Sequence, residues 1–248
     1  MDVKRNAVIT GGVGDIGTAA VKQLSPRVNT VVALDILEES DVGDWIAQLE
    51  SQGVANVSYK QLDVANYDQC EEVLGEICKE VGSIDYLINN AGITRDAVFT
   101  KMTKQQWDAV LRVNLDGMFN VTRPLATQMK QQQFGRIVNV SSVNAQKGQF
   151  SQANYAAAKA GIYGFTKSLA QELMASNITV NSISPGYVNT KLMKGIRPDI
   201  LESIIAQIPA KRLAEPDEIA WAIQFLLDER SAYMTGANLS FNGGLHMY

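Results

Sequence analysis

The sequence predicts a single α/β domain, in which a parallel seven-stranded sheet is doubly wound, with helices on both faces. Short apolar runs alternate along the chain with longer stretches of helical period, and this alternation is typical of the βαβ units of a parallel sheet. No Pro- or Ser-rich linker and no internal repeat interrupt the 248 residues. One domain spanning residues 1–248 is therefore the simplest interpretation.

Each strand is predicted from one short apolar run. The expected strands lie at residues 7–9, 30–34, 57–59, 86–88, 136–140, 178–183 and 238–241. Helical periodicity predicts helices at about 15–25, 40–52, 66–81, 103–132, 152–176 and 215–228. The segment at about 187–212 breaks this alternation. Because it follows the carboxyl end of a strand, where open α/β sheets bind ligands, we expect it to form a lid.

Composition excludes several classes of protein. The chain has 22 Lys and Arg against 26 Asp and Glu, so a net charge of −4 argues against nucleic-acid binding. No apolar run approaches the roughly 18 residues that cross a bilayer, and the first residues do not resemble a signal peptide. The sequence therefore predicts a cytoplasmic globular protein with no membrane partner.

A glycine-rich turn follows the first predicted strand. Residues 10–17, TGGVGDIG, run directly into a predicted helix. Glycines in such a turn let the backbone approach a pyrophosphate, whose charge is met by open N–H groups and the positive end of the helix dipole. The residues expected at this phosphate site are Gly11, Val13, Gly14, Asp15, Ile16 and Gly17.

An acidic residue ends the second predicted strand. Asp35 lies 18 residues after Gly17, where a carboxylate can accept hydrogen bonds from both hydroxyls of an adenine ribose. Residues 31–40 contain no Lys or Arg to receive a 2′-phosphate. A phosphate about 4 Å from the carboxylate would be disfavoured by several kcal/mol. We therefore expect NAD(H) as the preferred cofactor, with NADP(H) as the alternative.

Later strands end at the same edge of the predicted sheet. The third strand is followed by Leu62-Asp63-Val64, which places Asp63 near the adenine amino group, and the fourth ends in Asn89-Asn90-Ala91-Gly92. The further cofactor contacts expected here are Asp63, Val64, Asn90, Ala91 and Gly92.

A tyrosine and a lysine share one face of the predicted helix at 152–176. Tyr155 and Lys159 are four residues apart. Lowering a phenol pKa from about 10 toward 7 requires roughly 4 kcal/mol, and one ammonium about 4 Å away supplies an energy of that size. The pair can thus form a proton donor for neutral pH, although such pairs are also common on helix surfaces.

The combination of motifs resembles the short-chain dehydrogenases/reductases over essentially the whole chain. The motifs that agree in order and spacing are TGGVGDIG, NNAG, Asn114, Ser142, YAAAK at 155–159 and PGYVNT at 185–190. The resemblance implies a Rossmann-like fold and catalysis by Asn114, Ser142, Tyr155 and Lys159. Tyr155 would protonate a substrate carbonyl while the nicotinamide gives hydride to its carbon.

The resemblance also assigns the supporting roles. Lys159 would lower the phenol pKa and bind the nicotinamide ribose, Ser142 would orient the carbonyl oxygen, and Asn114 would hold a water. The cofactor contacts would be completed by Tyr155, Lys159, Pro185, Gly186, Val188 and Thr190. A homotetramer is implied, paired through the helices at 103–132 and 152–176 and through the last strand. No metal is expected, because His246 is the single histidine.

One residue departs from the family pattern. Asp15 stands where the usual TGxxxGxG motif has its middle glycine. Its carboxylate would either point to solvent as a favourable acid in the first helical turn or compete with the pyrophosphate. We expect weaker cofactor binding than in an Asp15→Gly variant.

Several segments resemble the acetoacetyl-CoA reductases of polyhydroxybutyrate synthesis more closely. These are NNAGITRD (89–96), SSVNAQKGQFSQANY (141–155), SPGY (184–187) and NGGLHM (242–247). The resemblance places Ser142, Gln149, Phe150 and Gln152 along the acyl pocket, Tyr187 opposite them, and Asp96 and Arg197 at its mouth. The implied reaction is reduction of acetoacetyl-CoA to 3-hydroxybutyryl-CoA.

The charge of the predicted lid fits an anionic substrate. Residues 186–212 carry five basic and two acidic side chains, a net charge of +3, which can attract the phosphates of coenzyme A. An acyl carrier protein would also suit this charge, so 3-oxoacyl-[acyl-carrier-protein] reduction is an alternative. Asp35 leaves open an NAD-linked 3-hydroxyacyl or 3-hydroxybutyrate dehydrogenase. A dinucleotide-binding redox sensor is the non-enzymatic alternative.

Overall fold

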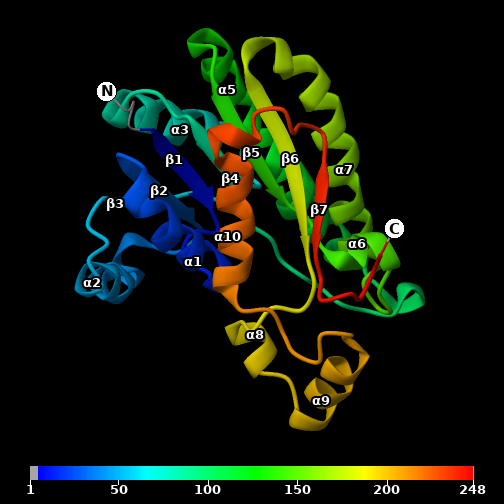
Figure 1. Cartoon of the computed structure of the whole chain (residues 1–248). Helices are drawn as coiled ribbons and strands as arrows, with labels where there is room; N and C mark the ends of the chain where they lie inside the picture. The colour runs from blue at the N-terminus through cyan, green and yellow to red at the C-terminus, as the bar shows by residue number, and fades with distance from the viewer. Residues whose placement is uncertain (1–4, 248) are drawn as a thin grey trace.

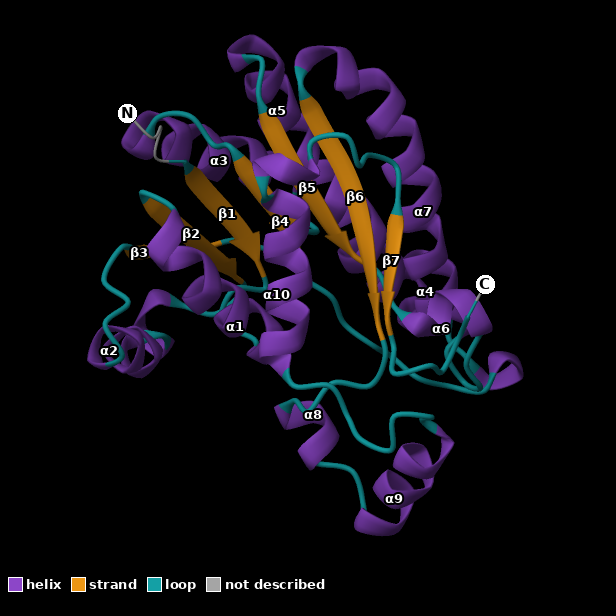
Figure 2. Ribbon diagram, viewed as in Figure 1, coloured by secondary structure: helices purple, strands orange, loops and turns teal. Residues whose placement is uncertain are grey.

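The computed structural model describes residues 5–247 and confirms the predicted fold. One parallel sheet of seven strands runs through the described chain in the order β3-β2-β1-β4-β5-β6-β7 (Figures 1 and 2). The strands are β1 (Asn6–Thr10), β2 (Thr30–Asp35), β3 (Val57–Gln61), β4 (Tyr86–Asn89), β5 (Gly135–Val140), β6 (Ile178–Pro185) and β7 (Asn238–Phe241).

Helices cover both faces of the sheet. On one face lie α1 (Asp15–Leu24), α2 (Gly43–Ser51) and α10 (Pro216–Leu227); on the other lie α3 (Tyr67–Val81), α5 (Gly117–Gln132) and α7 (Ala153–Leu173). Successive residues of β1 point to opposite faces. Ala7 and Ile9 pack in the cluster formed with α1 and α10, whereas Val8 packs in the cluster formed with α3, α5 and α7.

The single helix predicted at 103–132 is interrupted in the structure. It consists of α4 (Lys104–Leu111), a π-helical turn (Arg112–Asp116) and α5. The turn coincides with Asn114, which is fully buried: its Oδ1 accepts from Ile93 N at 2.8 Å and its Nδ2 donates to Ile93 O at 2.9 Å. These two bonds fix Asn114 against the segment that follows β4, a contact that helical periodicity does not reveal.

A short helix absent from the sequence prediction follows β5. In α6 (Val143–Lys147), the Ser142 hydroxyl oxygen caps the helix by accepting from Asn144 N at 3.1 Å. The helix is too short to show a period, so the sequence pattern predicted only a loop there.

The segment at 187–212 forms a small unit below the carboxyl edge of the sheet (Figure 1). It contains α8 (Lys191–Lys194) and α9 (Pro198–Gln207). Ala214 N donates to Tyr187 O at 2.9 Å and Asn189 N to Ala214 O at 2.8 Å, so the two ends of the unit are held together at its base. Between residues 5 and 247, no helix has the length and apolar character needed to cross a membrane.

Two glycines of the first turn are required by packing. A Cβ on Gly17 would lie 2.1 Å from the carbonyl oxygen of Gly11, and one on Gly12 would lie 2.7 Å from the Cβ of Ala33. A Cβ on Gly14 would meet nothing closer than 3.4 Å. The close packing of the turn on β2 therefore depends on Gly12 and that of α1 on the turn depends on Gly17, while Gly14 has room for a methyl group.

We predict that Gly17→Ala lowers the free energy of unfolding by about 3 kcal/mol and Tm by about 9 °C, because backbone atoms must move to accept the methyl group. Gly14→Ala is the matched control and should cost less than about 1 kcal/mol. Thermal unfolding of the two purified variants measures both values. Equal Tm losses would contradict the packing argument.

Candidate active site

A cavity of about 370 Å³ lies at the carboxyl edge of the sheet, beside the turn after β1. The sheet order reverses between β1 and β4, and ligands of open α/β sheets bind at such a switch point. Many of the predicted cofactor contacts line this cavity. They are Gly11, Gly14, Asp15, Ile16, Asp35, Asp63, Val64, Asn90, Ala91, Gly92 and Thr190.

Some predicted contacts lie elsewhere. The predicted contacts that do not line the cavity are Val13, Gly17, Tyr155, Lys159, Pro185, Gly186 and Val188. Gly17 is buried in α1, Pro185 ends β6, and Val188 is buried beside Ala214. Their effect on the cavity is through the backbone that they shape.

Sequence reasoning missed four apolar residues of the lining. They are Ile36, Leu62, Ile93 and Val113. The first three directly follow or precede a predicted contact, which is a signal that the sequence offered. Val113 is carried to the cavity by the π-helical turn, and only the folded chain shows it.

The residues present fit a nicotinamide dinucleotide. Gly14 begins α1 without a side-chain cap, so the first N–H groups of that helix are left for another acceptor such as a pyrophosphate. The turn itself is held from β4: Asn90 Nδ2 donates to the carbonyls of Thr10 and Gly11 at 3.2 and 3.0 Å. The turn after β1, which is suited to bind the pyrophosphate, is thus held in place by hydrogen bonds within the protein.

Asp35 ends β2 as predicted and faces the cavity. Its Oδ2 accepts from Val13 N at 3.3 Å and its Oδ1 from Ile36 N at 2.9 Å. These bonds orient the carboxylate, and each oxygen retains a lone pair for a hydroxyl group. No Lys or Arg is among the residues that line the cavity.

From the sequence, the Asp15 carboxylate was expected either to point to solvent or to compete with the pyrophosphate. In the structure it makes a different contact. Its Oδ2 accepts from the backbone N of Lys191 at 2.7 Å, at the first residue of α8. The carboxylate therefore joins the turn after β1 to the segment 187–212, while still lining the cavity.

The predicted catalytic pair lies in the first turns of α7, as the spacing indicated. Tyr155 is half-buried and Lys159 is buried. The Lys159 ammonium donates to Val140 O at 2.7 Å and lies 5.8 Å from the centre of the Tyr155 ring. A Cβ on Gly92 would be 3.4 Å from both Lys159 Nζ and Asn114 Oδ1. Gly92 therefore joins this pair to the cofactor cavity.

The pKa of the phenol differs from the sequence expectation. Burial raises the pKa of Tyr155, the charge of Asp96 raises it further, and a hydrogen bond with Ser142 opposes both. Lys159 was expected to lower this pKa; its ammonium donates to Val140 O and lies 5.8 Å from the centre of the phenol ring, and the effect of burial on the phenol is the larger one. Desolvation lowers the pKa of Lys159 itself to about 8.

Ser142 is placed to direct a hydrogen bond into the site. Its oxygen already accepts from Asn144 N, so its hydroxyl hydrogen is available to Tyr155 or to a substrate oxygen. Two bonds hold the neighbouring backbone: Ser141 Oγ donates to Lys159 O at 2.8 Å, and Tyr163 Oη donates to Ser142 O at 3.2 Å. This geometry suits a group that orients a carbonyl oxygen.

The predicted substrate residues divide into two groups. Gln152 Nε2 donates to Asp96 at 2.9 Å, and its Oε1 accepts from Asn144 at 2.9 Å, so a polar chain runs beside Ser142. By contrast, Phe150 is 79% exposed, and Arg197 pairs with Asp199 on the surface of the segment 187–212. The structure does not bring Arg197 into contact with the other predicted substrate residues.

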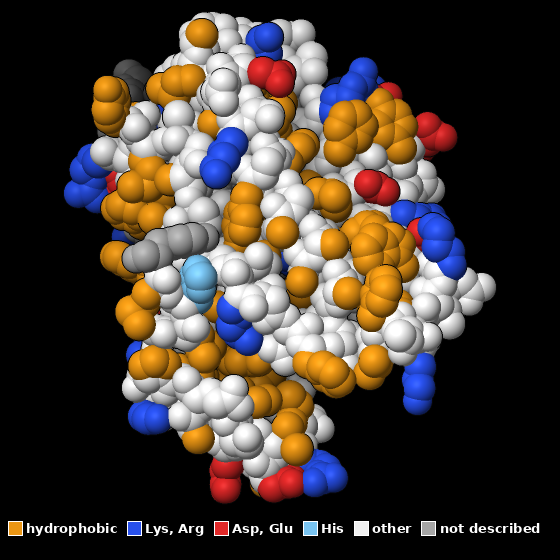
Figure 3. Space-filling model, turned by 90° about the vertical axis from the view of Figure 1, so that its right-hand side faces the viewer, with side chains coloured by type: hydrophobic (Ala, Val, Ile, Leu, Met, Phe, Trp, Pro, Cys, Tyr) orange, Lys and Arg blue, Asp and Glu red, His pale blue; other side chains and the backbone are white. Residues whose placement is uncertain are grey.

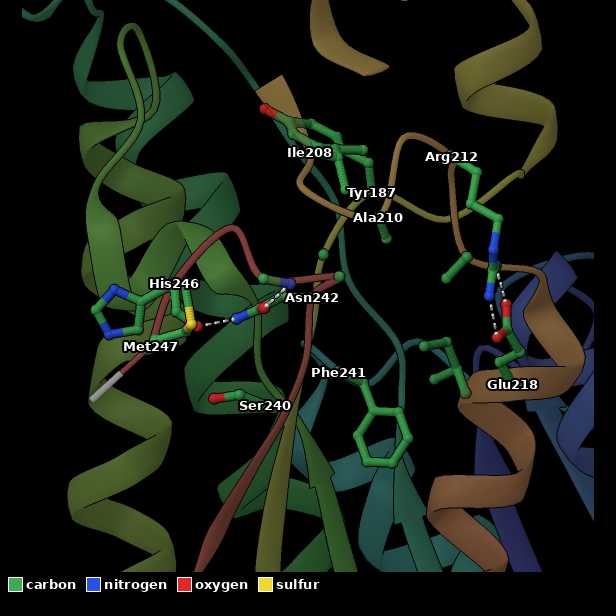
Figure 4. A pocket seen from close by; sticks show the side chains of 15 residues that line it. Tyr187, Ile208, Ala210, Arg212, Glu218, Ser240, Phe241, Asn242, His246 and Met247 are labelled. Atoms are coloured by element: carbon green, nitrogen blue, oxygen red, sulfur yellow. Dashed lines mark hydrogen bonds and ion pairs between the residues drawn. The ribbon is translucent and has the colours of Figure 1, made fainter. Parts of the chain in front are cut away.

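Gly186 and Tyr187 line a second cavity, of about 550 Å³ (Figure 4). Its walls are the C-terminal segment 240–247, the start of α10 and residues 208–214. Arg212 and Glu218 form an ion pair on one side, and Asn242 Nδ2 donates to His246 O at 2.9 Å on the other. The Tyr187 hydroxyl also reaches Gln149 Oε1 at 3.5 Å, so Tyr187 separates this cavity from the predicted acyl pocket.

The fold and this arrangement of residues define a dinucleotide-dependent oxidoreductase. The family described as enoyl-(acyl carrier protein) reductase matches residues 12–246. The chain belongs to the short-chain dehydrogenases/reductases, as its motifs predicted, and this family uses nicotinamide dinucleotides. Among residues 5–247, no cluster of His, Cys, Asp or Glu is arranged to hold a metal ion.

The chain is similar to two acetoacetyl-CoA reductases over almost its whole length. It is 48% identical to that of Allochromatium vinosum and 47% identical to that of Cupriavidus necator, covering 98% of this chain and 99% of each relative. It is 41% identical to a 3-oxoacyl-[acyl-carrier-protein] reductase of Thermotoga maritima, with 96% of each chain covered.

Because Lys159 is buried, we predict that replacing it stabilises the folded protein by an amount that depends on pH. Between about pH 8 and 10.5 the unfolded chain keeps the Lys159 proton that the folded chain releases, so wild-type stability rises with pH in this window. Lys159→Met should be more stable than wild type below pH 8, by about 3 kcal/mol at most. The difference should shrink toward pH 10.5.

Thermal unfolding across this pH range measures the effect. Lys167→Met, an exposed position two turns further along α7, is the matched control and should show no pH-dependent difference. A constant difference between Lys159→Met and wild type would argue against the lowered pKa.

Proposed function

We propose that this chain reduces acetoacetyl-CoA to 3-hydroxybutyryl-CoA with NADH, in the cytoplasm and as a step of polyhydroxybutyrate synthesis. The observation that carries the proposal is that Tyr155 lies near both Ser142 and Lys159, and that Lys159 adjoins Gly92, which lines the cofactor cavity. The similarity to acetoacetyl-CoA reductases supports the choice of substrate.

Tyr155 is the proposed proton donor. A phenol is protonated at neutral pH, and burial, which raises the pKa of Tyr155, keeps the proton on it until the substrate oxygen becomes basic. When bound, the reduced nicotinamide supplies hydride to the carbonyl carbon. Tyr155 gives its proton to the carbonyl oxygen, which Ser142 orients by donating its hydroxyl hydrogen.

Lys159 and Asn114 are proposed to support the phenolate that remains. With a pKa of about 8, the Lys159 ammonium is mainly charged at pH 7 and stabilises a negative phenolate nearby. Asn114 lies beside it, and both adjoin Gly92. The proposed water held by Asn114 would connect Lys159 to solvent and return the proton.

The preference for NADH over NADPH rests on Asp35. The carboxylate is fixed at the edge of the cavity, and the cavity lining has no basic side chain to neutralise a 2′-phosphate. Asp63 and the apolar Ile36 and Leu62 lie in the same lining and suit an adenine ring.

The segment 187–212 is proposed to act as the substrate lid, and three of its five basic side chains already have partners within the protein. Arg197 pairs with Asp199 and Arg212 with Glu218, and Lys211 Nζ donates to Ala206 O. Lys191 and Lys194 of α8, next to the cofactor cavity, remain the best candidates to meet the phosphates of coenzyme A.

A second candidate is reduction of a 3-oxoacyl thioester carried by acyl carrier protein. The similarity to the Thermotoga maritima reductase favours it. The two candidates share the chemistry at Tyr155 and differ in the carrier of the thioester.

Self-association into a homotetramer is proposed from the family resemblance and from one exposed surface. Trp221 and Phe225 of α10 are exposed and stacked, and Tyr233 is fully exposed. Figure 3 shows hydrophobic side chains over the face that carries β7 and the C-terminal segment. An exposed apolar surface of this kind suits contact with a second copy.

We predict that Tyr155→Phe lowers kcat for NADH oxidation with acetoacetyl-CoA at least about 1,000-fold, because the proton donor is removed. NADH binding should change less than about twofold. Comparing acetoacetyl-CoA with an acetoacetyl carrier-protein thioester and free acetoacetate identifies the carrier. Turnover by Tyr155→Phe at the wild-type rate would refute the mechanism, and a higher kcat/KM for the carrier-protein thioester would favour the second candidate.

We predict a higher kcat/KM with NADH than with NADPH for the wild type. Asp35→Ser should reduce this discrimination by about 10- to 100-fold, because the repulsion of the 2′-phosphate is lost. Glu38→Gln, an exposed acid outside the cavity lining, is the matched control. More efficient use of NADPH by the wild type would overturn the assignment.

A further inference from the structure

We propose that Asp15 is a positioning residue, whose carboxylate holds the start of the lid, residues 187–212, against the turn that faces the dinucleotide phosphates. The contact is the 2.7 Å hydrogen bond from Lys191 N to Asp15 Oδ2, between residues 176 positions apart. The proposal rests on the proposed function where it concerns substrate binding.

The start of the lid has no cap of its own. Thr190 has the extended backbone of a capping residue, yet its side chain makes no capping bond with α8. The N–H of Lys191 finds its acceptor in Asp15 instead. The contact is therefore part of what orders the first turn of the lid.

The hydrogen bond between Lys191 and Asp15 also joins two walls of the cofactor cavity. Asp15 and Thr190 both line that cavity, one from α1 and the other from the lid. Moving the lid outward would break the hydrogen bond and open the cavity at the same point. Dinucleotide binding at α1 and closure of the lid over the thioester are coupled through this one side chain.

The carboxylate has two effects of opposite sign. As an acceptor it orders the lid, which favours substrate binding. As a negative charge in the first turn of α1, it repels the pyrophosphate that this turn is suited to bind. A glycine, the usual residue of the family motif at this position, would have neither effect.

Two variants separate these effects. Asp15→Asn keeps an acceptor and loses the charge, whereas Asp15→Ala loses both. The lid carries trypsin sites at Lys191, Lys194, Lys211 and Arg212, whereas the bond after Arg197 is protected by Pro198. The initial rate of tryptic cleavage within residues 191–212, followed by mass spectrometry on the native chain, reports lid opening without any substrate.

We expect the lid of Asp15→Ala to be cleaved roughly fivefold faster than wild type, and that of Asp15→Asn to be cleaved within about twofold of it. Asp44→Ala, an exposed acid in the first turn of α2, is the control for loss of a surface charge. Both Asp15 variants should bind NADH at least about twofold more tightly by fluorescence titration. The KM for acetoacetyl-CoA should be about fivefold higher in Asp15→Ala than in Asp15→Asn.

Equal cleavage of Asp15→Ala and Asp15→Asn would overturn the proposal, and so would equal KM values for acetoacetyl-CoA in an active enzyme. If the wild type does not reduce acetoacetyl-CoA, the proposed function fails. In that case the cleavage rates alone decide the role of Asp15.

Discussion

The whole site depends on the hydrogen bonds that join the carboxyl ends of β1 and β4. Thr10 Oγ1 accepts from the backbone N of Asn90 and of Ala91 at 3.0 and 3.1 Å, and Asn90 returns two bonds to the turn that follows Thr10. These strands are neighbours in the sheet where its order reverses. The same bonds therefore shape the phosphate turn and place Gly92 beside Lys159, which connects cofactor and catalytic pair.

Buried hydrogen bonds between amide and hydroxyl side chains fix α7, which carries Tyr155 and Lys159, to the sheet beside the junction of β1 and β4. Asn89 donates to Asn139 at 2.8 Å, and Asn139 donates to Thr166 of α7 at 3.0 Å. Each of these groups is almost fully buried, so each unmade bond would cost about 1–3 kcal/mol. These hydrogen bonds allow α7 only one position on the sheet. The position of the helix that carries Tyr155 and Lys159 is thereby set by groups outside the predicted site.

The sequence predicted what local pattern and order along the chain determine. Strand positions, the turn after β1, Asp35 at the end of β2 and the spacing of Tyr155 and Lys159 all follow from such patterns. Contacts between distant segments were not predictable. The π-helical turn depends on Asn114 meeting Ile93, and the orientation of Asp15 depends on Lys191. The raised pKa of Tyr155 follows from burial, which only the packed chain defines.

Burial shifts the pKa values of the two proposed catalytic groups in opposite directions. It raises the pKa of Tyr155 and lowers that of Lys159, since both neutral forms are less costly to bury. At pH 7 the resting site thus holds a protonated phenol beside a mostly charged ammonium. A reductase needs this protonated phenol, whereas an alcohol dehydrogenase needs a phenolate. Asp96 makes the phenolate less favourable still, so Tyr155 would hold its proton until hydride transfer makes the substrate oxygen basic enough to take it.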